Sequence, residues 1–154
     1  MRDRIDFLWQ THSYINEYIR LAEAKAVALL TVFGALLGLV LDQASGSLSG
    51  GERVLLVVAI TLSATVMAVA GFVVFPRTRG QPTGAIYWRS VRSVTEEDFG
   101  QLAKETTDAQ MLDRLSKHVY ELAGVATEKY RGLQIAFTVA VAAFVFGIWA
   151  LTVL

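Results

Sequence analysis

The sequence predicts an all-α membrane protein with three transmembrane helices and a cytoplasmic helical module, formed by the N-terminal amphipathic helix and the segment between spans 2 and 3. The first observation is composition, because 54% of the 154 residues are hydrophobic and only 18% are charged, whereas soluble domains carry about 25% charged residues. The mean hydropathy is correspondingly positive, at +0.46. The second observation is that the apolar residues gather in three long stretches, with nearly all of the charge lying between or before them.

Two of these stretches are each long enough to cross a bilayer. Val54–Phe75 and Leu133–Leu154 both contain 22 residues and no charge, and a spanning helix needs about 20 mostly apolar residues. The alternative is that they are buried helices of a soluble bundle, but such helices normally keep one polar stripe. The only polar side chains in the first of the two are Thr61, Ser63 and Thr65. We therefore interpret both stretches as membrane spans.

The third stretch, Ala26–Leu41, is shorter, with 16 uncharged residues that would measure about 24 Å at 1.5 Å per residue. It becomes long enough to span if the membrane segment begins near Leu21. Glu23 and Lys25 then lie at the depth of the lipid headgroups, where long charged side chains can reach the interface. The sequence therefore predicts a first span with charged residues at one edge.

The distribution of Lys and Arg predicts the orientation. Of the 14 such residues, 13 lie in residues 1–25 or 77–131, and the loop Asp42–Arg53 holds only Arg53. Since positively charged segments stay in the cytoplasm, we expect a cytoplasmic N-terminus and an external C-terminus. The predicted single domain, 1–154, comprises a cytoplasmic amphipathic helix (1–25), span 1 (26–41), an external loop (42–53), span 2 (54–75), a cytoplasmic helical region (76–132) and span 3 (133–154).

The N-terminal segment has the pattern of an amphipathic helix. Its apolar residues recur at three- and four-residue steps or their sums, and no Pro or Gly interrupts it before Gly34. We therefore expect one helix to run from this segment into the first span. The apolar stripe consists of Ile5, Leu8, Ile15, Ile19 and Ala22.

The segment after the second span carries several helix signals. Pro76 cannot continue a helix and ends the span. Thr95 is typical of an N-cap, and Thr107 with Gln110 has the spacing of a capping box. A long helix is expected from near Asp108 into the third span, because no proline intervenes.

This last helix begins with a coiled-coil-like seam of apolar residues. We interpret the seam as packing on the N-terminal helix of the same chain, whose own apolar stripe needs a cover. The alternative is a coiled coil between copies of the chain. The seam consists of Leu112, Leu115, Val119, Leu122 and Ala126.

Few residues in the sequence could perform chemistry. It lacks a phosphate-cradling Gly-rich motif and the HExxH metal motif, and the three carboxylates at 96–98 are explained by the preference of a helix start for negative charge. There are no cysteines, and the two histidines, His12 and His118, lie far apart in the sequence. We therefore predict no enzyme, no metal site and no nucleic-acid partner.

One basic and aromatic cluster has the composition of an anion site. Arginine binds phosphate through two parallel hydrogen bonds, and aromatic rings stack on bases, so these residues together could hold a small nucleotide. The alternative is anchoring to anionic lipid headgroups. The candidate ligand-binding residues are Arg77, Arg79, Arg89, Arg92, Tyr87 and Trp88.

Charged residues also lie where the helices enter the membrane. Lys129 ends the seam helix at the membrane edge, and Glu23 and Lys25 lie at the equivalent depth of the first span. They could simply anchor the helices at the interface. The functional interpretation is a cross-helix pair of Glu23 with Lys129 that couples the cytoplasmic module to the spans.

Small residues within the spans allow helices to approach closely. Gly34 and Gly38 form a GxxxG pair, and Ala143 with Gly147 forms a second pair of the same spacing. Such pairs serve packing between spans of one chain or between copies.

Five short sequence features follow one another along nearly the whole chain. They are AEAKAVALL (Ala22–Leu30) after the amphipathic leader, Pro76-Arg77 after the second span, Tyr87-Trp88, Glu97-x-Phe99, and YELAGVATEKY (Tyr120–Tyr130) before the last apolar helix. In order and spacing, over about 150 residues, the chain resembles the small transmembrane effectors of bacterial Pycsar anti-phage defence.

The resemblance implies a function that the composition alone does not. In that system a cyclase makes cyclic CMP or cyclic UMP on infection, and the effector responds by damaging the inner membrane before phage matures. The chain would then be a homo-oligomeric effector in the bacterial inner membrane, with a cyclic pyrimidine nucleotide as its ligand and no other cofactor. The alternatives are a related membrane effector that answers a different nucleotide signal, and a membrane scaffold subunit that senses nothing.

Overall fold

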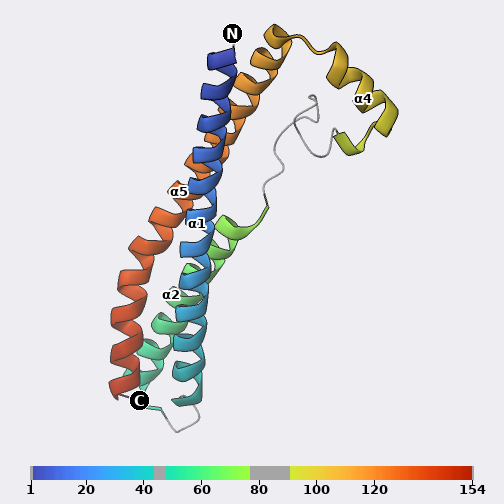
Figure 1. The fold of residues 1–154 in the computed structure, drawn as a ribbon. Coiled ribbons are helices and arrows are strands. Elements are labelled where there is room, and N and C mark those ends of the chain that lie inside the picture. The colour runs from blue at the N-terminus through green and yellow to red at the C-terminus, as the bar shows by residue number, and fades with distance from the viewer. Residues whose placement is uncertain (1, 44–47, 77–90, 154) are drawn as a thin grey trace. The chain divides into compact units, whose positions relative to one another are not determined.

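The computed structural model describes residues 2–43, 48–76 and 91–153 (Figure 1). The helices in this part of the chain are α1 (Arg2–Gln43), α2 (Gly50–Val74), α4 (Glu96–Glu105) and α5 (Asp108–Val153). Three of them, α1, α2 and α5, are long and apolar enough to cross a membrane. The all-α class and the three candidate spans are therefore confirmed, whereas the cytoplasmic location of the remaining helical parts stays a prediction.

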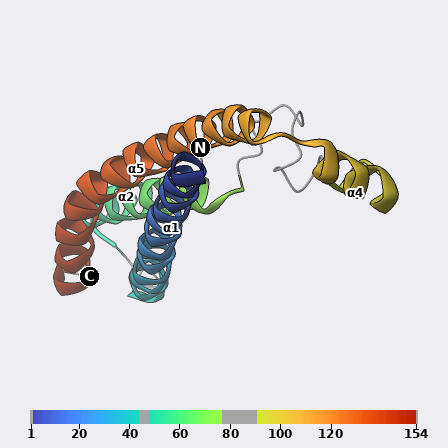
Figure 2. The ribbon, with the colours of Figure 1, turned by 45° about the horizontal axis from the view of Figure 1, so that its top comes forward.

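The helices α1 and α5 are each continuous, as predicted. They contain 42 and 46 residues and are drawn as unbroken ribbons in Figure 2. Neither contains a proline, which is the residue that most strongly interrupts a helix. Each helix therefore joins a charged N-terminal half to an apolar C-terminal half without a break.

The chain divides into two compact units. We call residues 20–75 with 128–154 the apolar unit, and residues 1–19 with 76–127 the polar unit. Both α1 and α5 contribute to each unit. The predicted span boundaries are positions relative to a bilayer, so they stay predictions.

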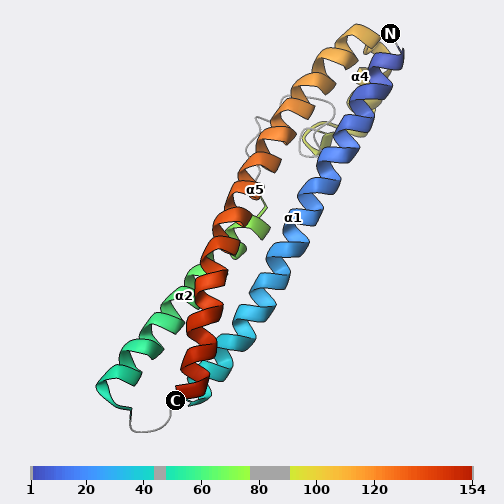
Figure 3. The ribbon, with the colours of Figure 1, turned by 90° about the vertical axis from the view of Figure 1, so that its left-hand side faces the viewer.

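The apolar unit is a bundle of three helices in which α1 and α5 run in one direction and α2 in the other (Figure 3). Each helix buries residues that recur at three- and four-residue steps or their sums, which is the spacing of one helix face. The faces that remain exposed carry large apolar side chains such as Val32, Val57 and Phe144. Exposed apolar faces around an apolar core are what lipid, rather than water, requires of a helix bundle.

The buried core of this unit uses the smallest side chains on α5. In α1 and α2 it includes Phe33, Leu36 and Val66, whereas on α5 it consists of one leucine and four alanines. Small residues let membrane helices pack closely through van der Waals contact. The buried residues of α5 in this core are Leu133, Ala136, Ala140, Ala143 and Ala150.

Two glycines extend this narrow face of α5. A Cβ added at Gly147 would lie 2.7 Å from Leu36 Cδ2, and one added at Gly132 would lie 2.9 Å from Val73 Cγ2. The Ala143–Gly147 pair thus packs within the chain. Gly38, by contrast, has nothing within 4 Å of an added Cβ, so the described residues make no close contact there.

The helices extend into the predicted external loop 42–53, whose position relative to a bilayer stays a prediction. Helix α1 continues to Gln43, and α2 begins at Gly50. Ser49 is the N-cap, and its side chain accepts a hydrogen bond from the Glu52 N–H, while the Glu52 carboxylate accepts one from the Ser49 N–H at 2.6 Å. Hydrogen bonds to the Glu52 carboxylate, first from the Ser49 N–H and then from the Ser49 side chain, lower the pKa of Glu52. The Ser-x-x-Glu spacing of a capping box was present in the sequence and was missed.

The other predicted helix ends are confirmed. Thr95 is the N-cap of α4, and its hydroxyl accepts a hydrogen bond from the Asp98 N–H. Thr107 and Gln110 exchange the reciprocal hydrogen bonds of a capping box at the start of α5. The helix α2 ends at Val74, directly before Phe75 and Pro76.

In the polar unit the seam of α5 packs on α1. Leu115 and Val119 are buried, and the rings of His12 on α1 and His118 on α5 lie 5.3 Å apart between centroids. The other seam residues of α5 are half-buried, as are Ile5, Leu8 and Ile15 of α1. The predicted packing of the seam within one chain is therefore confirmed.

Candidate functional site at a three-helix junction

The predicted ligand-binding cluster is mostly outside the described residues. Arg77, Arg79, Tyr87, Trp88 and Arg89 all fall in the range 77–90. Arg92 lies in the described part of the chain and is exposed. The proposed assignment of this cluster to a nucleotide therefore stays a prediction.

The structure brings together two of the three charged residues predicted at the membrane edge, Glu23 and Lys129. Lys129 continues the spacing of the α5 seam, three residues after Ala126 and four before the buried Leu133. Alternating steps of three and four keep these positions on one face of a helix, so the helix itself directs Lys129 into the bundle. Lys129 is 2% exposed, which is unusual for a charged side chain.

The Lys129 ammonium has partners on both other helices of the apolar unit. It donates a hydrogen bond of 2.8 Å to Glu23 Oε1 of α1 and a second, short one to the Val73 carbonyl oxygen of α2. Glu23 is partly open to solvent, with 37% of its side chain exposed. We call Glu23, the Val73 carbonyl and Lys129 the clasp, because together they join α1, α2 and α5 at one point.

The contribution of α2 follows from where this helix ends. In a helix the Val73 carbonyl would accept from the N–H four residues later, and that position lies beyond the end of α2 at Val74. The last carbonyls of a helix carry partial negative charge and favour a cation. Lys129 is that cation, so it caps α2 from a neighbouring helix.

Sequence reasoning identified two members of the clasp and missed the third. Glu23 and Lys129 could be recognised in the sequence as opposite charges at an equivalent depth in the membrane. The third partner is a backbone carbonyl oxygen, which every residue carries, so the residue type does not indicate it. The available signal was Pro76, which ends α2 and leaves carbonyls such as that of Val73 without helical partners. Lys25 is exposed and lies outside the clasp.

The polar unit contains a second cluster, around its two histidines. The ring of Trp9 meets that of His12 edge-on at 5.4 Å, and Asn16 lies within hydrogen-bond distance of the same ring, 3.2 Å from Nε2. Burial lowers the pKa of His12, and the charge of His118 lowers it further. The neutral form of His12 is therefore favoured.

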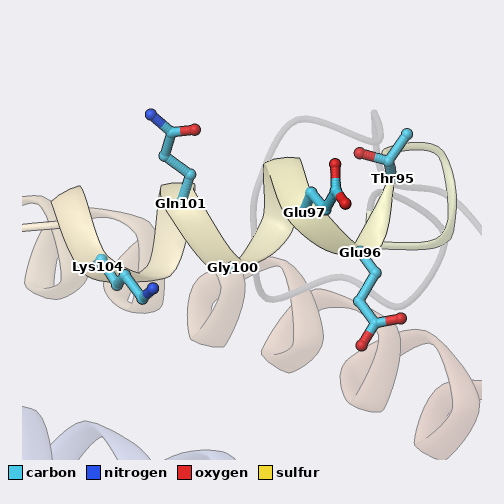
Figure 4. A pocket seen from close by; sticks show the side chains of 6 residues that line it. All are labelled: Thr95, Glu96, Glu97, Gly100, Gln101 and Lys104. Atoms are coloured by element: carbon cyan, nitrogen blue, oxygen red, sulfur yellow. The ribbon is translucent and has the colours of Figure 1, made fainter.

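A shallow depression lies along α4 (Figure 4). Its lining comes from the N-cap and one helix only, and the side chains point to different sides of that helix, so they do not converge on a ligand. Among the residues that the structure describes, no group of three His, Asp or Glu side chains could hold a metal ion. The depression is lined by Thr95, Glu96, Glu97, Gly100, Gln101 and Lys104.

Comparison with known proteins accounts for nearly the whole chain. The family model of the Pycsar effector protein domain, PycTM, matches residues 7–154. The Pycsar effector protein SaPycTM of Staphylococcus aureus is 29% identical over 128 residues, which cover 82% of this chain and 81% of that protein. No solved structure matches the chain. Because the family model matches residues 7–154, well over half of the chain, the chain belongs to the PycTM family of Pycsar effectors, multi-pass membrane proteins of anti-phage defence that are not enzymes.

Proposed function

We propose that this Pycsar effector is activated by cyclic CMP or cyclic UMP and that activation makes the bacterial inner membrane permeable. The observation that carries the proposal is the family match over residues 7–154, which assigns the chain to the effector side of the defence system. The three apolar helices support the membrane as the place of action. The identity of the nucleotide is our inference from the resemblance of the chain to effectors of pyrimidine cyclases.

The proposed orientation places residues 1–25 and 76–132 in the cytoplasm and the C-terminus outside. Its support is the position of 13 of the 14 Lys and Arg residues in 1–25 or 77–131, because positively charged segments stay in the cytoplasm. The cytoplasm is also where a cyclase product would accumulate. Loop 42–53 and the N-cap of α2 would then face outward, and the chain would act as a single domain.

The proposed nucleotide site is the basic and aromatic cluster of the cytoplasmic region. Arginine would bind the cyclic phosphate through paired hydrogen bonds, and an aromatic ring would stack on the pyrimidine. The exposure of Arg92 is compatible with binding from solution. The cluster comprises Arg77, Arg79, Arg89, Arg92, Tyr87 and Trp88.

We propose that the ligand acts by shifting an equilibrium between two arrangements of the spans in a homo-oligomer. A ligand shifts such an equilibrium only by its difference in affinity for the two states, and a change from 1:99 to 99:1 needs about 5.5 kcal/mol. Several copies that bind together supply this energy more readily than one phosphate contact. The buried core of the apolar unit is almost entirely apolar, which favours disruption of the bilayer over a selective water-filled channel.

Dye release from liposomes tests this function. The purified chain is reconstituted and exposed to cyclic CMP, cyclic UMP, cyclic AMP and cyclic GMP in turn, and we expect release with a pyrimidine nucleotide only. The double variant Arg77→Ala/Arg89→Ala should lose the response, while Arg53→Ala, outside the cluster, should keep it. Release with a purine nucleotide alone would assign a different signal, and release that ignores every nucleotide would contradict ligand activation.

A further inference from the structure

One buried charge joins the three helices of the apolar unit. The Lys129 ammonium reaches Glu23 of α1 and the Val73 carbonyl of α2 and is 2% exposed. We propose that this clasp holds the apolar unit in its resting arrangement and that activation of the effector separates it. The proposal rests on the proposed function, since it describes how membrane permeation is controlled.

The clasp holds the one helix end that lies at this junction. Both α1 and α5 continue through the junction, whereas α2 stops at Val74. The side chain of Val73 faces Gly132 of α5 there, because a Cβ added at Gly132 would lie 2.9 Å from Val73 Cγ2. Lys129 adds a charged hydrogen bond to the backbone of that same residue, so the last turn of α2 meets α5 through both a side chain and a backbone cap.

The chain beyond α2 leads directly to the proposed nucleotide site. Pro76 is three residues after Val73, and the basic cluster begins at Arg77. A displacement carried along the chain through Pro76 therefore reaches α2 at its capped end. Because a carbonyl that loses its donor must find another, displacement of the last turn of α2 would remove one of the two acceptors of Lys129.

The energetics make the clasp sensitive to such a displacement. A buried ammonium is tolerated only when its donors are matched by acceptors. Glu23 alone would then hold the charge, and its carboxylate is 37% exposed, so it can turn toward water. Lys129, on a long flexible stem, can likewise reach the headgroups once α2 has moved. Loss of one partner thus favours loss of the other.

Dye release in the absence of any nucleotide tests the clasp. Lys129→Met keeps the apolar stem but removes the charge and the donors, and we expect basal release to rise about tenfold, as it would if a minor open state of about 1% became ten times more populated. Glu23→Gln should give a smaller rise, because the Val73 contact remains. Lys25→Met is the matched control, since Lys25 is exposed and outside the clasp, and it should not change basal release.

A disulfide across the same junction gives an independent test. The chain has no cysteine, and the position of a Gly132 Cβ lies 2.9 Å from Val73 Cγ2, close enough for a bridge between cysteines introduced at these two positions to be considered. In the variant Val73→Cys/Gly132→Cys, oxidation should suppress release and reductant should restore it. Adding Lys129→Met to this pair should give release without nucleotide only after reduction.

The outcomes separate the two proposals. If the unmodified chain releases dye on addition of a nucleotide, but folded Lys129→Met shows no raised release without one, the clasp is refuted and the proposed function stands. If no nucleotide acts but Lys129→Met releases dye, the clasp stands and ligand activation fails. If Lys129→Met does not fold, the cysteine pair decides, because full release from its oxidised form would show that α2 and α5 need not separate.

Discussion

Close packing of α5 on α1 at Gly147 makes a quantitative prediction about stability. Replacing Gly147 by alanine adds a methyl group 2.7 Å from Leu36 Cδ2 and 3.2 Å from its Cδ1 and Cγ, whereas carbon atoms prefer about 3.5–4.0 Å. Leu36 is 7% exposed and lies in the core. The leucine must therefore leave its rotamer or the two helices must separate, and such overpacking costs about 1–3 kcal/mol.

A second glycine in the same unit provides the control. Gly38→Ala adds its methyl group where nothing lies within 4 Å. Both substitutions gain the same helix propensity, about 1 kcal/mol, so the difference between them isolates the clash. Gly147→Ala should be about 1–3 kcal/mol less stable than Gly38→Ala, which corresponds to a melting temperature lower by on the order of 5 °C.

Thermal unfolding in detergent, followed by the loss of the monodisperse species, measures this difference. Leu36→Ala should relieve the clash, so the double variant Leu36→Ala/Gly147→Ala should show a favourable coupling energy of about 0.5–3 kcal/mol. Equal melting temperatures for Gly147→Ala and Gly38→Ala, together with additive effects in the double variant, would refute the packing of α5 described here.

Three further predictions concern the helix ends and the histidine pair. Ser49→Ala should destabilise the chain by about 1 kcal/mol, because it removes the N-cap of α2, and Ser49→Asp should restore the loss in the same unfolding measurement. Thr107→Ala should reduce the helix content of the N-terminal turns of α5, measured by hydrogen exchange, since the capping box there would lose its acceptor. The lowered pKa of His12 predicts a stabilising contribution that is complete above its ordinary pKa of 6.5 and is lost as the pH falls through the lowered value. Chemical-shift titration of the two histidines should show this lowered pKa, and His118→Gln should bring it closer to 6.5; a titration at or above 6.5 in the unmodified chain would contradict the burial of His12.

The sequence was most informative where one physical preference dominated. Uncharged runs of 22 residues have few stable locations other than a bilayer, and the caps at Thr95 and Thr107 use side chains whose preference for a helix start is strong. The continuity of α1 and α5 followed from the lack of a proline. These features are local, so a single sequence was sufficient to predict them.

The sequence was less informative where the structure depends on backbone atoms or on tertiary contact. The opposite charges of Glu23 and Lys129 suggested a pair, but the third partner is the carbonyl of Val73, which no residue type indicates. The capping box of Ser49 and Glu52 at the start of α2 was not identified from the sequence, although its spacing is local. Nor could the sequence distinguish Gly147, where an added Cβ would clash with Leu36, from Gly38, where an added Cβ would meet nothing within 4 Å.

The lengths of α1 and α5 have a consequence for how a soluble anion meets this protein. At 1.5 Å per residue their 42 and 46 residues measure about 63 and 69 Å, roughly twice the 30 Å of hydrocarbon in a bilayer. Because the hydrocarbon layer is shorter than either helix, a large part of each helix lies outside it when the apolar half spans the bilayer. The electrostatic field of an anionic leaflet decays over about 8 Å in physiological salt. A negatively charged molecule that meets helix residues farther than this from the headgroups is therefore governed by the protein's own side chains and is hardly repelled by the lipid phosphates.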